Sequence, residues 1–201
     1  MLERTSLYRE VLFFVFFDDL LFGFSSQGPS AGTLTQLFMP EKNMLYLLLG
    51  ANLGDRLQSF KQARQMIQSR IGFIFQSSSV YETAPWGVVN QPSFLNQVLE
   101  IKTELNANVV LENILKIEQE LGRIRHQRWT ARSIDIDILY FNDLVLDSES
   151  LTIPHPRLHQ RRFTLAPLAE IAPEYIHPIL NRTNLQLLVS CNDDGAVSIL
   201  S

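Results

Sequence analysis

Apolar and polar positions from residue 44 onward alternate between strand-like and helix-like periods. Continuous apolar runs or two-residue alternation, typical of strands, occur in four segments: 44–50, 77–81, 94–101 and 134–141. Two intervening stretches carry apolar residues at helical spacing. Asp55 and Asn106 stand where an N-cap would begin each helix, and Gly72 and Gly122 stand where each would end. The stripes that we expect to be buried are Leu57, Phe60, Ala63, Ile67 and Ile71, then Val110, Ile114, Ile117 and Leu121.

The predicted order is therefore β-α-β-β-α-β. Residues 144–146 are predicted to pair back on the 134–141 strand as a hairpin, and short helices are predicted at 163–171 and 183–190. This order indicates an α+β fold, a ferredoxin-like βαββαβ sandwich with a mostly antiparallel sheet and an added C-terminal hairpin and helices. Helices cover one face of such a sheet, and the other face is free to build a site.

Residues 1–43 differ in composition from the rest of the chain. Their apolar run Val11–Phe17 is too short to span a membrane and is followed directly by Asp18 and Asp19. Residues 25–35 are rich in Ser, Gly and Thr, as linkers are. We expect residues 1–43 to be an N-terminal extension, disordered or not native, and residues 44–201 to form one domain that begins at Met44.

The composition limits the classes of function. The chain has 201 residues, 46% of them apolar, which is enough for a sizeable core. Its net charge of −4 argues against a protein that binds nucleic acid over its whole surface. The single cysteine, Cys191, excludes an internal disulfide and fits a reducing compartment, so we expect a cytoplasmic protein.

The residues with the clearest chemistry lie between 122 and 141. Asp135 and Asp137 alternate with isoleucines, so on a strand both carboxylates face one side, roughly 7 Å apart. Such oxygen ligands suit Mg²⁺, which keeps waters and substrate phosphates as its other ligands. The preceding loop carries four arginines and Trp129. Cations beside magnesium-binding carboxylates indicate phosphoryl transfer, although Asp-x-Asp alone would also fit a solvated edge strand.

Several separated motifs extend this interpretation: Tyr81–Gly87, Phe94–Asn96, Arg128–Asp137 and Pro154–Phe163. In this order and spacing the chain resembles the 6-hydroxymethyl-7,8-dihydropterin pyrophosphokinases of folate biosynthesis, from Met44 to about Pro178. The resemblance implies transfer of pyrophosphate from ATP, the co-substrate, to the pterin's hydroxymethyl group, giving AMP and the pterin diphosphate with the help of two Mg²⁺ ions. The domain at 44–201 would then be a pyrophosphokinase domain.

The resemblance also assigns roles to residues. Asp135 and Asp137 match the metal ligands, and with Arg123 and Arg132 they form the catalytic set. The residues matched to nucleotide binding are Glu118, Arg125, Trp129, Ile138, Thr152, His155 and Arg161. Those matched to the pterin are Thr83, Ala84, Trp86, Phe94, Asn96, Trp129 and Phe163. Phe94 stands where many members have tyrosine, which keeps the stacking face and loses a hydroxyl.

The sequence fits three other classes of function less well. The chain lacks the Gly-x₄-Gly-Lys-Ser/Thr signature of a P-loop kinase. An RNA-binding module can share the fold, but two aspartates on its central strand would repel phosphates without metal. A metal-dependent nuclease could use Asp-x-Asp, but the segment offers no evident third acidic ligand. We therefore expect ATP and the pterin as small-molecule partners, no nucleic acid, no membrane, and a monomer.

Overall fold

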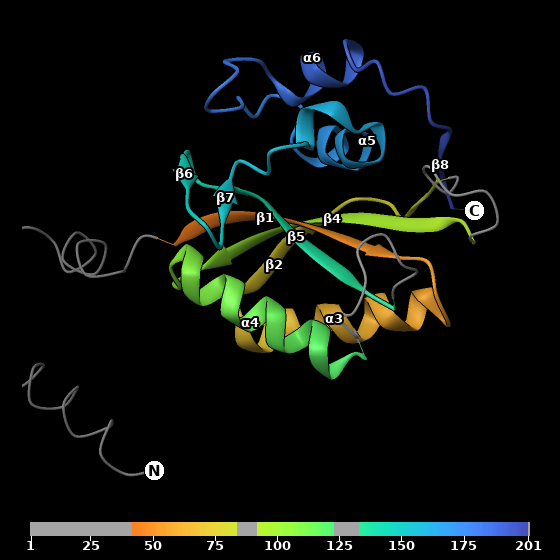
Figure 1. The fold of residues 1–201 in the computed structure, drawn as a ribbon, viewed down its shortest axis with the longest axis vertical. Coiled ribbons are helices and arrows are strands. Elements are labelled where there is room, and N and C mark those ends of the chain that lie inside the picture. The colour runs from red at the N-terminus through yellow and green to blue at the C-terminus, as the bar shows by residue number, and fades with distance from the viewer. Residues whose placement is uncertain (1–41, 84–91, 123–132, 201) are drawn as a thin grey trace, which may run out of the picture. The chain divides into compact units, whose positions relative to one another are not determined.

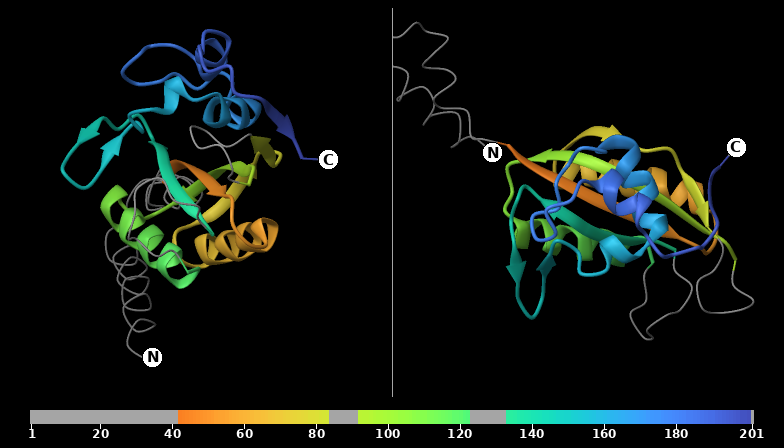
Figure 2. Two further views of the ribbon diagram at one scale, coloured as in Figure 1. Left: turned by 45° about the vertical axis from the view of Figure 1, so that its right-hand side comes forward. Right: turned by 90° about the horizontal axis from the view of Figure 1, so that it is seen from above.

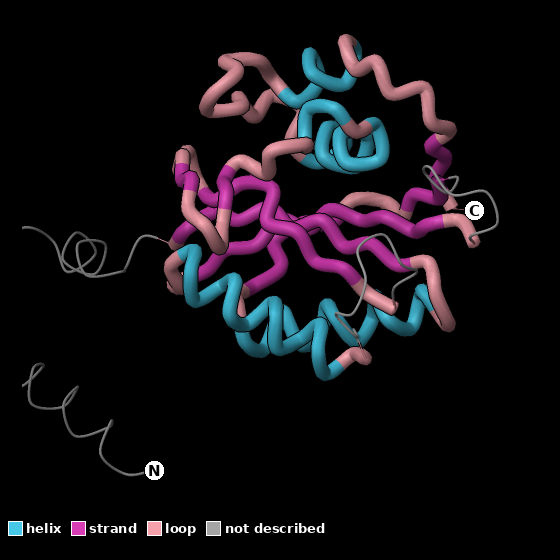
Figure 3. The backbone as a smooth tube through the Cα atoms, viewed as in Figure 1, coloured by secondary structure: helices cyan, strands magenta, loops and turns pink. Residues whose placement is uncertain are grey.

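The computed structural model describes residues 42–83, 92–122 and 133–200. A sheet lies at its centre, in the order β5-β1-β4-β3-β8, with β2 also paired to β4, and all of these pairs are antiparallel (Figures 1 and 3). Its strands are β1 (Asn43–Ala51), β2 (Phe73–Ser77), β3 (Tyr81–Thr83), β4 (Phe94–Thr103), β5 (Asp135–Phe141) and β8 (Val197–Ile199). The prediction of a mixed α/β fold with a mostly antiparallel sheet is confirmed.

Helices cover both faces of the sheet. On one face lie α3 (Arg56–Arg70) and α4 (Ala107–Glu120), as predicted. On the other face, α5 (Arg162–Ile171) and α6 (Asn184–Val189) cross above the sheet (Figures 1 and 2). A single 3₁₀ turn, η1 (Leu158–Gln160), precedes α5. The free face expected from the sequence is thus partly covered, and only the remainder can build a site.

The helix starts follow the capping residues that the sequence predicts. The Asp55 carboxylate accepts the Gln58 N–H at 3.0 Å, and the Asn106 side chain accepts the Val109 N–H at 3.0 Å. Each bond satisfies one N–H that has no partner inside the helix. Gly122, with φ of 86°, follows α4 in the left-handed conformation that glycine adopts without strain.

Two buried clusters flank the sheet. The larger lies between the sheet and helices α3 and α4, and includes Leu47 and Leu49 of β1 and Ile136 and Ile138 of β5. The smaller lies under α5 and α6, and we call its part on the sheet the apolar half of that face. The apolar half consists of Tyr46, Leu48, Val98, Leu139 and Tyr140.

Three local predictions were wrong. Leu57 is exposed on α3 rather than part of the buried stripe. The second strand is not 77–81; it is split into β2 and β3. At the break the Ser78 N–H donates to the Val98 carbonyl at 2.9 Å, but the Val98 N–H donates to the Ser78 hydroxyl at 3.0 Å instead of to a backbone carbonyl.

The third wrong prediction was that residues 144–146 pair with β5 as a hairpin. Instead β6 (Leu146–Asp147) pairs with β7 (Thr152–Ile153) in a separate two-stranded sheet. Backbone groups on the outer edge of β5 have other partners, so they are not available to residues 144–146. The Ile136 N–H donates to Glu118 at 2.9 Å, and the Leu139 carbonyl accepts the His155 N–H at 3.0 Å.

The expectation for the extension at 1–43 falls almost wholly outside the described residues; β1 begins at Asn43, one residue before the predicted start. In the described ranges, no helix has the length and apolar character needed to cross a bilayer.

Candidate active site

One row of paired residues crosses the sheet at the end where β1 finishes and β4 and β5 begin. Gly50 pairs with Asp135 on one side and with Asn96 on the other, and Asn96 pairs with Tyr81. Paired residues of adjacent strands point to the same face. At about 4.8 Å per strand, Asp135 and Asn96 are therefore roughly 10 Å apart, with only a glycine between them.

We call this region the polar end of the sheet face, made up of Gly50, Thr83, Asn96, Asp135 and Asp137. It shares its face with the apolar half, since Leu48 pairs with both Val98 and Asp137. The register of β5 shifts between these regions, because Tyr46 pairs with Tyr140 and Leu47 with Ile138. This bulge at Leu139 lets Leu139 and Tyr140 both join the apolar half while the aspartates keep strict alternation.

The two aspartates are held by β5 and by a carboxylate beneath it. Both are partly exposed, while Ile136 and Ile138 between and beyond them are buried on the opposite face, as the alternation predicts. Glu118 on α4 is 1% exposed and accepts the Ile136 N–H, which lies between the aspartates on the outer edge of the sheet. Glu118 was matched to the nucleotide; in the structure it fixes the backbone that carries the acidic pair.

Asn96 and Thr83 form a buried polar pair at the other end of the row. The Asn96 amide nitrogen donates to Thr83 Oγ1 at 3.0 Å, which fixes the amide orientation. Its Oδ1 lies 3.6 Å from the position that a Cβ on Gly50 would take, so the acceptor faces the glycine. Thr83 accepts this bond and so keeps its own proton for another acceptor. Phe94 pairs with Thr83 and points to the same face.

His155 lies among charged groups beside β5. Its backbone N–H donates to the Leu139 carbonyl, and its Nδ1 accepts the Arg157 N–H at 3.2 Å. Burial, followed by the charges of Arg161 and Arg157, lowers its pKa to about 4, against the opposing influence of Asp135. His155 is therefore neutral at physiological pH and carries its proton on Nε2. His155 thus lies close enough to Arg161 and Asp135 for both charges to affect its pKa.

Three other predicted residues have more specific positions. Phe163, in the first turn of α5, packs against the apolar half, with the Arg161 guanidinium 5.4 Å from its ring centre. The Ile138 side chain faces the core under α3 and α4, so only its backbone could meet a ligand on the edge. Thr152 lies in β7, where its hydroxyl donates to Asp147 at 3.1 Å.

The remaining predicted residues lie outside the described ones: Ala84, Trp86, Arg123, Arg125, Trp129 and Arg132. Conversely, sequence reasoning gave Gly50 no role beyond ending a strand and gave Arg56 none. The contacts of both are with residues far away in the sequence, which no local pattern signals.

An acidic pair, a buried amide and a neutral histidine among arginines, gathered at one end of a sheet face, fit the class of phosphate-transferring enzymes. Comparison with known proteins gives the particular family. Residues 46–173, more than half of the chain, match the family model for 7,8-dihydro-6-hydroxymethylpterin-pyrophosphokinase. The chain belongs to this family, which transfers pyrophosphate from ATP to hydroxymethyldihydropterin in folate synthesis.

Individual relatives agree with the family match. The 2-amino-4-hydroxy-6-hydroxymethyldihydropteridine pyrophosphokinase of Bacillus subtilis is 45% identical over 66% of this chain and 80% of its own length. That of Aquifex aeolicus is 43% identical over 69% and 86%. A crystal structure of Plasmodium falciparum HPPK-DHPS matches with a TM-score of 0.62 at 20% identity, over 76% of this chain. The chain spans less than half, 46%, of that longer protein, and this likeness concerns the fold alone.

Proposed function

We propose that this chain transfers the β,γ-pyrophosphoryl group of ATP at the polar end of the sheet face. The hydroxymethyl oxygen of 6-hydroxymethyl-7,8-dihydropterin attacks the β-phosphorus, the bond to the α-phosphate oxygen breaks, and AMP leaves. The observation that carries this proposal is the row Asn96–Gly50–Asp135. Asn96 can form hydrogen bonds with a pterin and Asp135 can bind a metal ion; the two lie about two strands apart, and the glycine between them has no side chain to fill the space.

The pterin would lie over Gly50 with its amide edge toward Asn96 and Thr83. The Asn96 Oδ1 is an acceptor for pterin N–H groups, and the Thr83 hydroxyl is a donor, so the pair complements a ring edge that carries both kinds of group. Phe94 on β4 and Phe163 on α5 would stack on the two ring faces, from the sheet and from the covering helix. Ala84, Trp86 and Trp129 stay predictions from the resemblance.

The acidic pair fits Mg²⁺. Asp135 and Asp137 are partly exposed carboxylates on one face, and within the described ranges no group of three or more His, Cys, Asp or Glu side chains is arranged to hold a metal ion. Two carboxylates with the remaining positions left to water and phosphate oxygens are what Mg²⁺ favours, rather than a cage made entirely by the protein. Two such ions, when bound, would offset the charge that develops on the transferred group.

The other phosphate contacts come from the neighbours of Asp135. Neutral His155 offers its Nε2–H as a donor to a phosphate oxygen, and Arg161 offers a guanidinium fork. Arg123, Arg125 and Arg132 would approach from the loop before β5, with Arg123 and Arg132 acting on the transferred group. Thr152, Glu118 and the Ile138 backbone are weaker candidates for nucleotide contacts.

The finer features of the protein are proposals of the same kind. The order β5-β1-β4-β2, antiparallel throughout and with both crossover helices on one face, supports the ferredoxin-like βαββαβ arrangement. We propose a monomer that works in the cytoplasm, with the domain beginning near Met44.

The direct test is release of AMP from ATP by the full chain, with and without 6-hydroxymethyl-7,8-dihydropterin, with Mg²⁺ present. We expect AMP only when the pterin and Mg²⁺ are both present. Release of ADP, or release that does not depend on the pterin, would contradict the proposal.

A further inference from the structure

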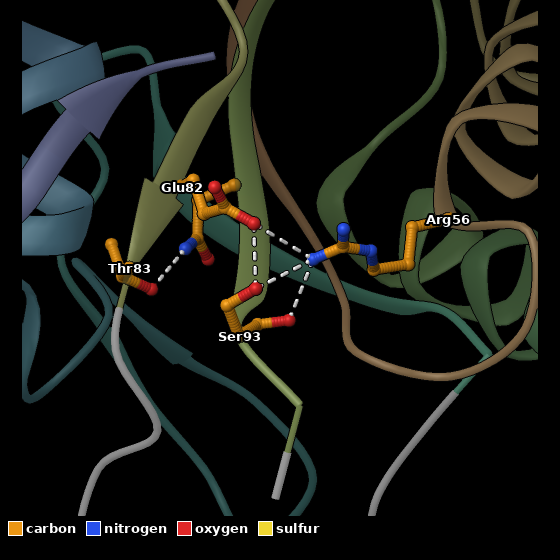
Figure 4. Close-up of polar contacts among 5 residues, drawn as sticks. Arg56, Glu82, Thr83 and Ser93 are labelled. Atoms are coloured by element: carbon orange, nitrogen blue, oxygen red, sulfur yellow. Dashed lines mark hydrogen bonds and ion pairs between the residues drawn. The ribbon is translucent and has the colours of Figure 1, made fainter.

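A polar network ties together three segments beside the proposed pterin site. Arg56, the first residue of α3, donates from one nitrogen, Nη1, to the Ser93 carbonyl at 2.8 Å, to Ser93 Oγ at 2.9 Å and to Glu82 Oε1 at 3.2 Å. The Ser93 hydroxyl in turn donates to Glu82 Oε1 at 2.6 Å. Figure 4 shows Arg56 reaching from its helix to both residues. These hydrogen bonds from Ser93 and Arg56 lower the pKa of the Glu82 carboxyl.

This network is adjacent in sequence to the pterin-reading groups but lies on the other face. Glu82 directly precedes Thr83, and Ser93 directly precedes Phe94. Glu82 pairs with Leu95, which is buried on the α3 side, whereas Thr83, Phe94 and Asn96 face the polar end. Arg56 therefore holds the ends of β3 and β4 from beneath, without touching the space that a substrate would fill.

A purely structural ion pair would look different. Arg70, in the last turn of the same helix, makes a two-pronged pair with Glu120 at 2.7 and 2.9 Å; Glu120 is the last residue of α4 and belongs to neither β3 nor β4. That pair joins two exposed helix surfaces. The Arg56 network instead includes a backbone carbonyl just before β4, so it fixes the position of the main chain at the point where Phe94 and Asn96 begin.

We propose that Arg56 is a positioning residue for the pterin substrate: through Ser93 and Glu82 it sets the separation of β3 and β4 at Thr83, Phe94 and Asn96. This inference rests on the proposed function, since it assumes that these three residues bind the pterin. Small displacements of positioning groups cost much of the binding or rate that depends on them. The ATP-binding groups on β5 and around His155 are anchored separately, by Glu118 and the Leu139 carbonyl, so they are unaffected.

The test is steady-state kinetics of the full chain carrying Arg56→Met, with each substrate varied in turn. We expect KM for the pterin to rise about tenfold, with KM for ATP and kcat changed by less than about twofold. Arg56→Lys should recover part of the loss, because an ammonium has three donors and all three bonds come from one nitrogen. Arg70→Met is the matched control, and it should leave both KM values unchanged.

A mutant cycle addresses the connection through Glu82. Glu82→Gln alone should raise KM for the pterin, and combining it with Arg56→Met should add little, because both act through one network. If Arg56→Met fails to fold, Arg56→Lys and Ser93→Ala carry the same test, with smaller increases expected.

Asn96→Ala distinguishes a failure of the proposed pterin site from a failure of the positioning role of Arg56. If Asn96→Ala leaves KM for the pterin unchanged, the proposed pterin site is wrong. If Asn96→Ala raises that KM but Arg56→Met does not, or if Arg56→Met raises both KM values equally, the site stands and the positioning role of Arg56 is overturned.

Discussion

The two regions of one sheet face lie on the same strands, on either side of the bulge at Leu139, yet one is a core and the other a candidate site. Along β1 the face reads Tyr46, Leu48, Gly50, and along β4 it reads Val98, then Asn96. In the apolar half, α5 and α6 bury the side chains, and the rings of Tyr46, Tyr140 and Tyr175 contact one another with centres 4.6–6.0 Å apart. At the polar end the same strands present two carboxylates, an amide and a glycine.

The difference shows that strand pairing alone does not distinguish core from site here. The identities of a few side chains in consecutive rows do so, together with where α5 stops covering the sheet. Changes in one region should therefore affect chemistry with little loss of stability, and changes in the other should do the reverse. The following predictions test this separation.

The largest effect should come from the acidic pair. Asp137→Asn keeps the shape of a partly exposed side chain but removes a charged ligand, so kcat should fall by about a thousandfold or more, which corresponds to roughly 4 kcal/mol. Thermal unfolding should be nearly unchanged. AMP release at saturating Mg²⁺ and circular dichroism melting measure the two quantities. The control is Glu149→Gln, which changes an exposed carboxylate beyond β6. Near-normal turnover of Asp137→Asn would show that Asp137 does not belong to the active site.

The converse change lies on α5. Leu168 is fully buried against the apolar half, and Leu168→Ala should reduce the free energy of unfolding by about 3 kcal/mol through lost burial and a cavity. Well below the melting temperature, both KM values should stay within about twofold of the parent. Urea denaturation combined with kinetics would check this. A large kinetic effect would mean that the covering helix and the polar end are coupled.

Features that depend on neighbouring residues were predictable from the sequence alone. The alternation of Asp135 and Asp137 with isoleucines determined their common face, and the caps Asp55 and Asn106 determined where two helices begin, because these features depend on residues within one turn or one strand. Leu57 fits the helical period but sits at the first turn of α3, beyond the packed part of the stripe, so periodicity overestimated its burial.

Features that depend on distant partners were not predictable in the same way. Gly50 matters because Asn96 and Asp135 flank it, 46 and 85 positions away in the numbering. The Ser78 hydroxyl accepts the Val98 N–H at the break between β2 and β3, and Arg56 contacts Glu82 and Ser93. The family resemblance located the reacting groups, but the contacts that hold them required the three-dimensional pairing.

Gly50→Ala tests whether the space above Gly50 at the polar end is needed for the substrate. The added methyl would lie 3.6 Å from Asn96 Oδ1 and 3.9 Å from Asp135 Cβ, which are ordinary contacts, so the fold should tolerate it. The methyl would occupy space between pterin and phosphates, and kcat/KM for the pterin should fall about tenfold, or roughly 1.4 kcal/mol.

Gly72→Ala is the contrasting variant. Its Cβ would stand 2.4 Å from the Lys102 carbonyl, so it should lower the melting temperature and leave the kinetics of the folded fraction intact. If Gly50→Ala instead lost stability and kept full kcat/KM, the glycine would serve packing rather than substrate.

The smallest predicted effect is a pH dependence of stability from His177, which packs against Tyr140 of the apolar half. His177 is 3% exposed, packs edge-on against Tyr140, and accepts the N–H groups of Ile179 and Leu180 at Nδ1. Burial, and then the nearby His159, lower its pKa to about 4, below the value of about 6.5 in an unfolded chain. The unfolded state thus binds more protons between these values, so this stabilisation is complete above about pH 6.5 and is lost as the pH falls toward 4.

Replacing His177 with asparagine should remove this dependence, because its Oδ1 can accept at the position of Nδ1 and does not titrate. Between pH 7 and 5.5 the parent should lose about 1 kcal/mol more stability than His177→Asn. Denaturant melts at the two pH values measure this difference; His155, whose pKa is lowered in the same direction, contributes equally to both chains and cancels. Parallel pH profiles for the two proteins would show that His177 is not held neutral by its burial.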